Sequence, residues 1–349
     1  MKILILTLFI FLFPVNAYAT DIPYIDGQDD FNTAVSDMYS GDFSLSPEKI
    51  IKSIIDTFMS EIRENAHYLI LFFIMGSISA IVTLIEFNDK SSSNAAFFAC
   101  YTMCAGIALS IMTNIVEYAT SIITTMSDFI TKLSPILVSL LLTSGKAVSA
   151  SAFHPVLGAA VYFVTLLVKK CIIPLAIYGS VLSVANNINE QIQISSSCKL
   201  ITSISKWIMT ATFTIFTGIC GIYGFSAPAL DILGAKTAKF AIGSLVPVVG
   251  RFLSDTMDTV ISASSAMKNA VGGAGIFTLF MICLVPVLKI AVMLFFLRIS
   301  AALIEPLTDK RISRLLSDMS EIVTLIFGMV LTVTVLFIIC ISIIVAATN

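Results

Sequence analysis

Four ionisable side chains lie close together in one stretch of an otherwise apolar chain. Lys239, Arg251, Asp255 and Asp258 fall within AKFAIGSLVPVVGRFLSDTMDTV, residues 238–260. The last three are spaced i, i+4 and i+7, which places them on one stripe of a helix. Such a group could serve a catalytic centre, an ion-coupled transport site, or a docking or pore-lining surface in an assembly.

Two interpretations of this stretch remain open. The charges form either a solvated, ion-paired face of a cytoplasmic amphipathic helix, or a stripe that lines water or contacts a partner. The second interpretation depends on Gly243, Pro247 and Gly250, which disfavour a helix just before the stripe. The candidate conduit or assembly residues in this stretch are Lys239, Pro247, Gly250, Arg251, Asp255 and Asp258.

Lys289 is a further candidate because it interrupts a long apolar segment. A lysine in the middle of a membrane span costs roughly 2.5–3.5 kcal/mol on insertion scales. We therefore expect it to face the interior of a helix bundle, a cavity or an acidic partner. The competing interpretation is a lysine at the tip of a hairpin that extends its ammonium group to the membrane surface.

The sequence predicts no enzyme, and no catalytic residue, cofactor or metal ion. The two histidines, His67 and His154, cannot form an H-E-x-x-H zinc helix, and no nucleophile elbow or phosphate-binding glycine loop is present. Cys100 and Cys104 share a helix face, but they lack the further ligands of a closed metal site. We interpret the seven scattered cysteines as ordinary buried residues.

The composition shows which solvent surrounds these residues. The chain is 57% hydrophobic and only 12% charged, with a mean hydropathy of +0.98. A soluble domain carries roughly 25% charged residues. This is therefore an integral membrane protein, and its net charge of −2 provides no basic surface for nucleic acid.

Three regions follow along the chain. Residues 1–19 are a predicted signal peptide, with an apolar core followed by the cleavage-site pattern Ala17-Tyr18-Ala19. An uncleaved anchor is the alternative. Residues 20–66 are an extracytoplasmic leader and an amphipathic helix that starts at Ser46-Pro47. Glu61 falls on the polar face of this helix, which lies on the membrane or against a partner. Residues 67–349 are the polytopic transmembrane domain.

The predicted fold is an all-α membrane helix bundle with about six to eight spans. Two shorter apolar runs, Pro135–Gly145 and Cys171–Ala185, are interpreted as re-entrant helices or as buried packing helices. Asn269–Ile304 is either a kinked span or a tight hairpin. The runs long enough to cross the membrane are Tyr68–Ile85, Ala95–Val116, Ala147–Val168, Trp207–Leu230 and Ile322–Ala347.

The lysine and arginine distribution predicts orientation. It places Lys169-Lys170, the segment Asp231–Lys268 and the Lys310–Arg314 cluster together on the cytoplasmic side. A weak internal similarity aligns the span starting at Trp207 with the span starting at Ile322. Either it marks inverted repeats, as in transporters, or it is a chance match of amphipathic helices.

Glycine and other small residues are concentrated in two of the spans. Gly218, Gly221 and Gly224 fall three apart, and Ser149–Ala152 with Gly158–Ala160 form a second small face. Such faces allow helix backbones to approach closely. We expect tight bundling or oligomer contacts there.

Three segments resemble the stage III sporulation protein AE family of endospore-forming bacteria. They are AKFAIGSLVPVVGRFLSDTMDTVISASSAMKNAVG, PLTDKRI at residues 306–312, and the C-terminal IIVAATN. The resemblance extends from about Ser46 to the C-terminus, whereas the leader before Ser46 is shorter than is usual in the family. It implies no catalytic residues.

The resemblance implies a place in an assembly. The family's proteins lie in the mother-cell membrane facing the forespore, with the other stage III sporulation A proteins and the forespore stage II sporulation protein Q as partners. Together these form a channel or secretion-like apparatus, as a hetero-oligomer that can include a homo-oligomeric ring.

The alternative hypothesis is a self-sufficient ion-coupled secondary transporter, with Lys289, Asp255 and Asp258 as coupling charges.

Overall fold

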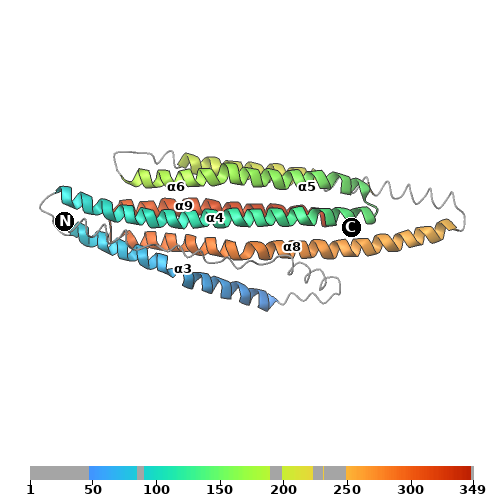
Figure 1. The fold of residues 1–349 in the computed structure, drawn as a ribbon, viewed down its shortest axis with the longest axis horizontal. Helices are drawn as coiled ribbons and strands as arrows, with labels where there is room; N and C mark the ends of the chain where they lie inside the picture. Colours follow the sequence, from blue (N-terminus) through green and yellow to red (C-terminus); the bar gives the residue numbers. More distant parts are fainter. Residues whose placement is uncertain (1–46, 85–89, 189–198, 223–230, 232–248, 347–349) are drawn as a thin grey trace.

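The computed structural model describes residues 47–84, 90–188, 199–222, 231 and 249–346, and they are almost entirely helical. Figure 1 shows the helices lying side by side in one elongated bundle. The expected all-α membrane fold is confirmed. The predicted signal peptide and leader up to Ser46 lie outside the described residues.

Long helices make up the bundle, and a further helix covers residues 199–222. Within the described residues, five helices are long and apolar enough to cross a membrane. The chain is therefore a multi-pass membrane protein. The labelled elements are α3 (Pro47–Leu84), α4 (Lys90–Thr143), α5 (Ala147–Leu167), the π-helical turn η1 (Val168–Ile172), α6 (Ile173–Ile188), α8 (Val249–Ile304) and α9 (Lys310–Ala346).

The longest helices exceed the thickness of a bilayer. α4 has 54 residues and α8 has 56, so they are about 81 and 84 Å long against about 30 Å of hydrocarbon. Pro135 lies inside α4, and the re-entrant interpretation of Pro135–Gly145 is wrong. The buried side chains of Leu133 and Leu137 on either side of the proline keep this turn packed in the bundle.

The sequence prediction places Lys169-Lys170 between two separate apolar runs, but the structure has no break there. α5 continues into α6 through η1, so Cys171–Ala185 is no separate re-entrant helix. A π turn holds one residue more than an α turn. Here Val168 and Ile172 stay buried while Lys170 is exposed. The chain passes two lysines without breaking the helix.

Neither α8 nor α3 is interrupted where the sequence suggested a boundary. α8 runs through Pro286 and Lys289, so the hairpin interpretation of this region is wrong. α3 begins at Pro47, where a proline loses no helical hydrogen bond. It continues through residues 66 and 67, so the amphipathic segment and the first span are one helix.

The turn between α4 and α5 shows how the sequence ends a helix. Gly145 has a φ of 74°, a conformation that suits glycine. The Gly145 N–H donates to the Leu142 carbonyl, and the Lys146 N–H donates to the Leu141 carbonyl. This is the Schellman arrangement, and it reverses the chain directly into α5.

α9 forms the centre of the bundle and is buried around most of its circumference. Close approach to it requires glycine on α8, because a Cβ at Gly272 would overlap Val345. Gly218 and Gly221 behave differently, since a Cβ at either would meet nothing within 4 Å. The small face at these two positions is not used for close packing in the described part of the chain.

The helix at residues 199–222 and α9 run in the same direction. Cys220 Sγ lies 3.9 Å from Cys340 Sγ, and Met209 lies beside Gly328. Nearer the start of both helices, Gly179 is close to Ile201 and Ile322. Positions therefore increase together along both helices, and the interpretation as oppositely oriented repeats is wrong.

The structure separates the basic residues that the sequence prediction groups on one side. Lys268 contacts the carbonyl of Val345, near the C-terminal end of α9, whereas Lys310 is the first residue of α9. The 37 residues of α9 extend about 55 Å. The orientation prediction used the hairpin alternative around Lys289, whereas the continuous α8 separates the two clusters.

Candidate functional site

Among the predicted site residues that the structure describes, Lys289 lies far from the others. Lys239 and Pro247 lie outside the described residues. Gly250, Arg251, Asp255 and Asp258 lie on the first turns of α8, and their side chains are outside the described part. Lys289 is on the same helix, but 31 residues beyond Asp258, or about 46 Å at about 1.5 Å per residue. It belongs to a different site.

Lys289 is buried and paired with an acidic residue. Its ammonium nitrogen lies 3.4 Å from Glu61 Oε1, and each residue is only 5% exposed. The same nitrogen lies 5.2 Å from the centre of the Tyr118 ring, within the range of a cation–π contact. One charged group thus joins three helices, α3, α4 and α8.

Polar groups around this pair complete what we term the central polar cluster. Asn65 Nδ2 donates to Glu61 Oε2 at 3.2 Å and to the Glu61 carbonyl at 2.9 Å. Asn114 Nδ2 donates to the Tyr68 hydroxyl at 3.3 Å, which links α3 to α4. The cluster consists of Glu61, Asn65, Tyr68, Asn114, Tyr118 and Lys289.

A second buried charge caps α5. Asp231 is 5% exposed, and its two carboxylate oxygens accept from the N–H groups of Val148 at 2.8 Å and Ser149 at 2.9 Å. A carboxylate is favourable at a helix N-terminus because unpaired N–H groups point at it. Burial lowers the pKa of the adjacent Lys146, and the charge of Asp231 offsets part of that shift.

Lys268 occupies the same end of the bundle. It is fully buried, and its ammonium group donates to the Val345 carbonyl at 2.8 Å. The carbonyls near a helix C-terminus carry partial negative charge. Lys268 therefore joins α8 to the last turns of α9. The sequence pattern around Lys268 does not predict this contact with a backbone carbonyl.

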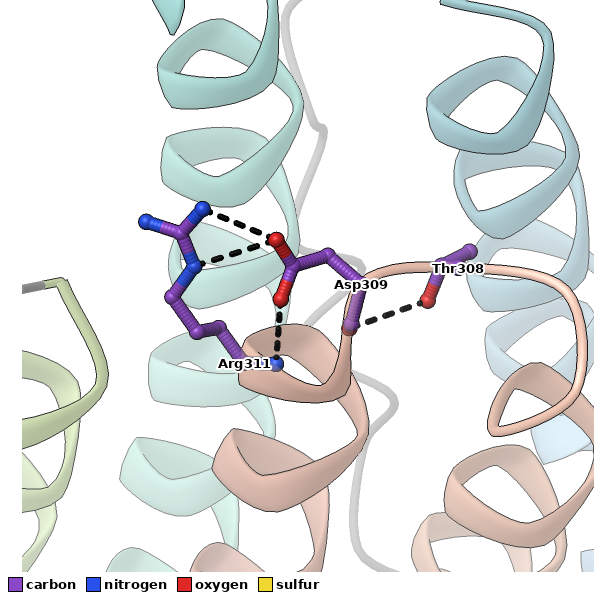
Figure 2. Close-up of polar contacts among 3 residues, drawn as sticks. All are labelled: Thr308, Asp309 and Arg311. Carbon is purple, nitrogen blue, oxygen red and sulfur yellow. Dashed lines mark hydrogen bonds and ion pairs between the residues drawn. The ribbon is translucent and has the colours of Figure 1, made fainter. Parts of the chain in front are cut away.

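The opposite end is held by the turn between α8 and α9, shown in Figure 2. Asp309 accepts from the Arg311 N–H at 3.0 Å and from its guanidinium group at 2.8 and 3.2 Å. The Thr308 hydroxyl donates to the Asp309 carbonyl at 3.4 Å. The guanidinium carbon of Arg311 also lies 3.9 Å from the centre of the Phe97 ring, which ties the turn to α4.

The pKa of Asp309 lies below its ordinary value. Burial alone would raise it, but the hydrogen bonds and positive charge of Arg311 outweigh burial. The carboxylate is therefore the favoured form in the folded protein. As the residue just before α9, it caps that helix through the Arg311 N–H.

These polar and charged groups join separate helices and turns of the bundle. Among the described residues, no group of three or more histidine, cysteine or acidic side chains could hold a metal ion. His67 is exposed and bonds the Glu64 carbonyl, and His154 is exposed on α5. A hollow between α5, residues 199–222 and α9 is lined mainly by apolar side chains such as Val164, Met209 and Leu336.

Sequence reasoning anticipated Lys289 but missed its partner. Glu61 was assigned to the exposed polar face of the amphipathic helix, yet it is buried. The available signal was its spacing from Asn65 and Tyr68, at i, i+4 and i+7, which places the three on one face of α3. The expectation that Lys289 needs an acidic or interior partner is confirmed.

A family model and a curated protein both match this chain, and both have the same description. The chain matches the family described as "Stage III sporulation protein AE" over residues 30–348. It is 31% identical over 318 residues to "Stage III sporulation protein AE" of Bacillus subtilis (strain 168), which covers 90% of this chain and 80% of that protein. No solved structure matches.

Proposed function

We propose, from the premise that this chain belongs to the stage III sporulation protein AE family, that it is a non-enzymatic subunit of a membrane apparatus required for endospore development. The apparatus is a channel or secretion-like complex between the mother cell and the forespore. The chain lies in the mother-cell membrane that faces the forespore.

One observation carries the non-enzymatic part of this proposal. The buried charges of Glu61, Lys289, Asp231 and Lys268 each contact another part of the bundle. An enzyme or ion-coupled transporter places such groups where a substrate or ion can reach them. Charges used to join helices are typical of a structural subunit whose task is to assemble.

The proposed partners are the other stage III sporulation A proteins in the mother-cell membrane and the stage II sporulation protein Q of the forespore. The resemblance of the sequence supports this choice. The exposed, open glycines Gly158 and Gly218 also support a protein partner. They provide surface where a neighbouring helix can approach closely.

Affinity purification from sporulating cells tests the proposal. A tagged full-length chain, solubilised in mild detergent, is expected to recover the other stage III sporulation A proteins. A tagged unrelated multi-pass protein of the same membrane is the control. Recovery of a lone monomer, with sporulation unaffected by deletion of the chain, would contradict the proposal.

The transporter hypothesis predicts a different outcome. It has two motivations, the inverted repeat and the coupling charges Lys289, Asp255 and Asp258. The parallel course of residues 199–222 and α9 removes the first. Purified chain reconstituted alone in lipid vesicles should show no solute uptake driven by an ion gradient. Uptake that disappears in a Lys289→Met variant would favour the transporter and overturn the structural role.

A further inference from the structure

The exposed face of α4 is polar along most of the helix. From Thr102 to Lys132, every exposed residue of α4 is glycine, serine, threonine or charged. Examples at helical spacing are Gly106, Ser110, Thr113, Ser121 and Thr125. We refer to the exposed residues of α4 from 102 to 132 as the polar stripe, and it extends about 45 Å.

The opposite face of the same helix is apolar and buried, with Ile111, Ile115 and Met126 among its core residues. α4 thus has apolar residues inside and polar residues outside. That is the pattern of a helix in a water-soluble bundle. A helix that faces lipid exposes apolar side chains instead, because hydrocarbon cannot hydrogen-bond to polar ones.

Other faces of the bundle do have the lipid-facing pattern. α3 exposes Ile70, Phe73, Ile74 and Ile78. α5 and α6 expose large apolar residues such as Phe163 and Tyr178. Figure 1 shows α4 between α5–α6 on one side and α3 with α8 on the other. The polar stripe therefore contrasts with the surfaces of the helices that flank it.

Three charged side chains in the stripe strengthen the contrast. Glu117, Asp128 and Lys132 are exposed, and none of them forms an ion pair with another described residue. Exposed to hydrocarbon, each would be strongly unfavourable. Several threonine hydroxyls donate to carbonyls one turn earlier, including those of Thr113 and Thr125. Their oxygen lone pairs stay available to accept hydrogen bonds from water.

We propose that the polar stripe of α4 faces water in the assembled complex, as the wall that this chain contributes to a hydrated passage. The inference rests on the proposed function, because neighbouring subunits must supply the other walls. The passage suits water and hydrophilic solutes. Its lining is set by hydroxyl groups and by Glu117, Asp128 and Lys132.

Cysteine labelling in membranes from sporulating cells tests this inference. Ser110→Cys, Ser121→Cys and Thr125→Cys are matched by Ile74→Cys and Tyr178→Cys on the apolar faces, and by Ala108→Cys in the core. A charged, membrane-impermeant thiosulfonate reagent reacts with the thiolate, which forms in water. Mass spectrometry of the peptide that carries each introduced cysteine separates its labelling from that of the native cysteines.

The stripe positions are expected to react at least about tenfold faster than the controls, since an ordinary thiol ionises in water near pH 8.5 whereas burial in apolar surroundings suppresses the thiolate. Reaction as slow as at Ile74→Cys would overturn the inference. So would protection combined with oxidant-induced disulfides between identical stripe positions of two copies, which would make the stripe a contact between copies. Either result leaves the recovery of partner subunits, and thus the proposed function, standing.

Discussion

Among the described residues, the ion pair of Glu61 and Lys289 joins two separate helices, α3 and α8. Removing one member of a buried pair leaves an uncompensated charge in a place where water cannot reach it. The contribution of the pair to the free energy of unfolding is therefore best measured by comparing a variant that lacks one charge with a variant that lacks both.

We expect Lys289→Met to reduce the free energy of unfolding by about 3–5 kcal/mol. The buried Glu61 carboxylate then has no positive charge beside it to offset the cost of its burial. Thermal unfolding in detergent measures the effect. The double variant Glu61→Gln/Lys289→Met should recover most of the loss, because no charge remains buried. A single variant as stable as the unmodified protein would show that the pair contributes nothing.

Asp309 offers a test of pH dependence at the α8–α9 turn. Its folded pKa is lowered by Arg311 despite burial, so its stabilisation is complete above the unfolded pKa of about 3.9. It is lost as the pH falls through the lower, folded value. Asp309→Ala should cost about 1 kcal/mol at neutral pH, and the difference from the unmodified protein should shrink below about pH 4.

The control for this prediction is Asp309→Asn, which keeps an acceptor for the Arg311 N–H but has no titrating group. Its stability should not share the extra loss in acid. Unfolding measured by circular dichroism between neutral and acidic pH follows both variants. An Asp309→Ala deficit that grows on acidification would reverse the assigned sign.

At the level of elements, helix packing depends on a few glycines and not on every small residue. Gly272 lets α8 approach α9 where Val345 occupies the space of a side chain. Gly218 lies on an exposed face with open space around it. The two positions look alike in sequence, but only one is a packing requirement within the chain.

Gly272→Leu is expected to destabilise the protein by about 1–3 kcal/mol, because the added side chain must displace Val345 from a packed interface. Gly218→Leu should leave the stability of the isolated chain nearly unchanged or slightly improved, since leucine favours a helix more than glycine does. Fluorescence-detected size exclusion after heating compares the two. Equal loss in both variants would contradict the packing of α8 on α9.

Tertiary packing also explains why the helices continue through positions where the local sequence predicts a boundary. Proline and paired lysines usually mark helix boundaries, yet Pro135 lies within α4 and Lys169-Lys170 lie within η1. Buried residues before and after each interruption keep the chain in the bundle. Tertiary packing outweighs the local cost of a missing hydrogen bond.

At the level of the whole molecule, the bundle separates two groups of charges by the length of α9. Lys268, Lys146 and Asp231 occupy one end, and Asp309, Lys310 and Arg311 occupy the other. Because about 55 Å separate the ends of α9, we expect the two groups to lie on opposite sides of the membrane.

Ser262→Cys and Glu305→Cys test this arrangement, because both positions are exposed and lie near opposite ends of α8. An impermeant thiol reagent should label one of them in intact protoplasts and the other only after the membrane is opened. Labelling of a known cytoplasmic protein is the control for leakage. Labelling of both from the same side would contradict the continuous α8.

The amino-acid sequence was sufficient to establish that the chain lies in a lipid bilayer, that its fold is helical, and that α3 starts at Pro47. It also indicated that Lys289 requires a partner. These features depend on composition, on the local backbone chemistry of proline, and on the cost of one charge in lipid. Each is a property of a residue and its immediate neighbours, so no folded structure is needed to infer it.

Only the tertiary structure identified Glu61 as that partner, joined the predicted short segments into long helices, and showed that the exposed face of α4 is polar. A hydropathy average over a window of residues does not distinguish one face of a helix from the other. Burial depends on which faces meet, and those contacts join residues far apart in the chain. The sequence alone therefore assigned Glu61 to water, and only packing against α4 and α8 placed it in the interior.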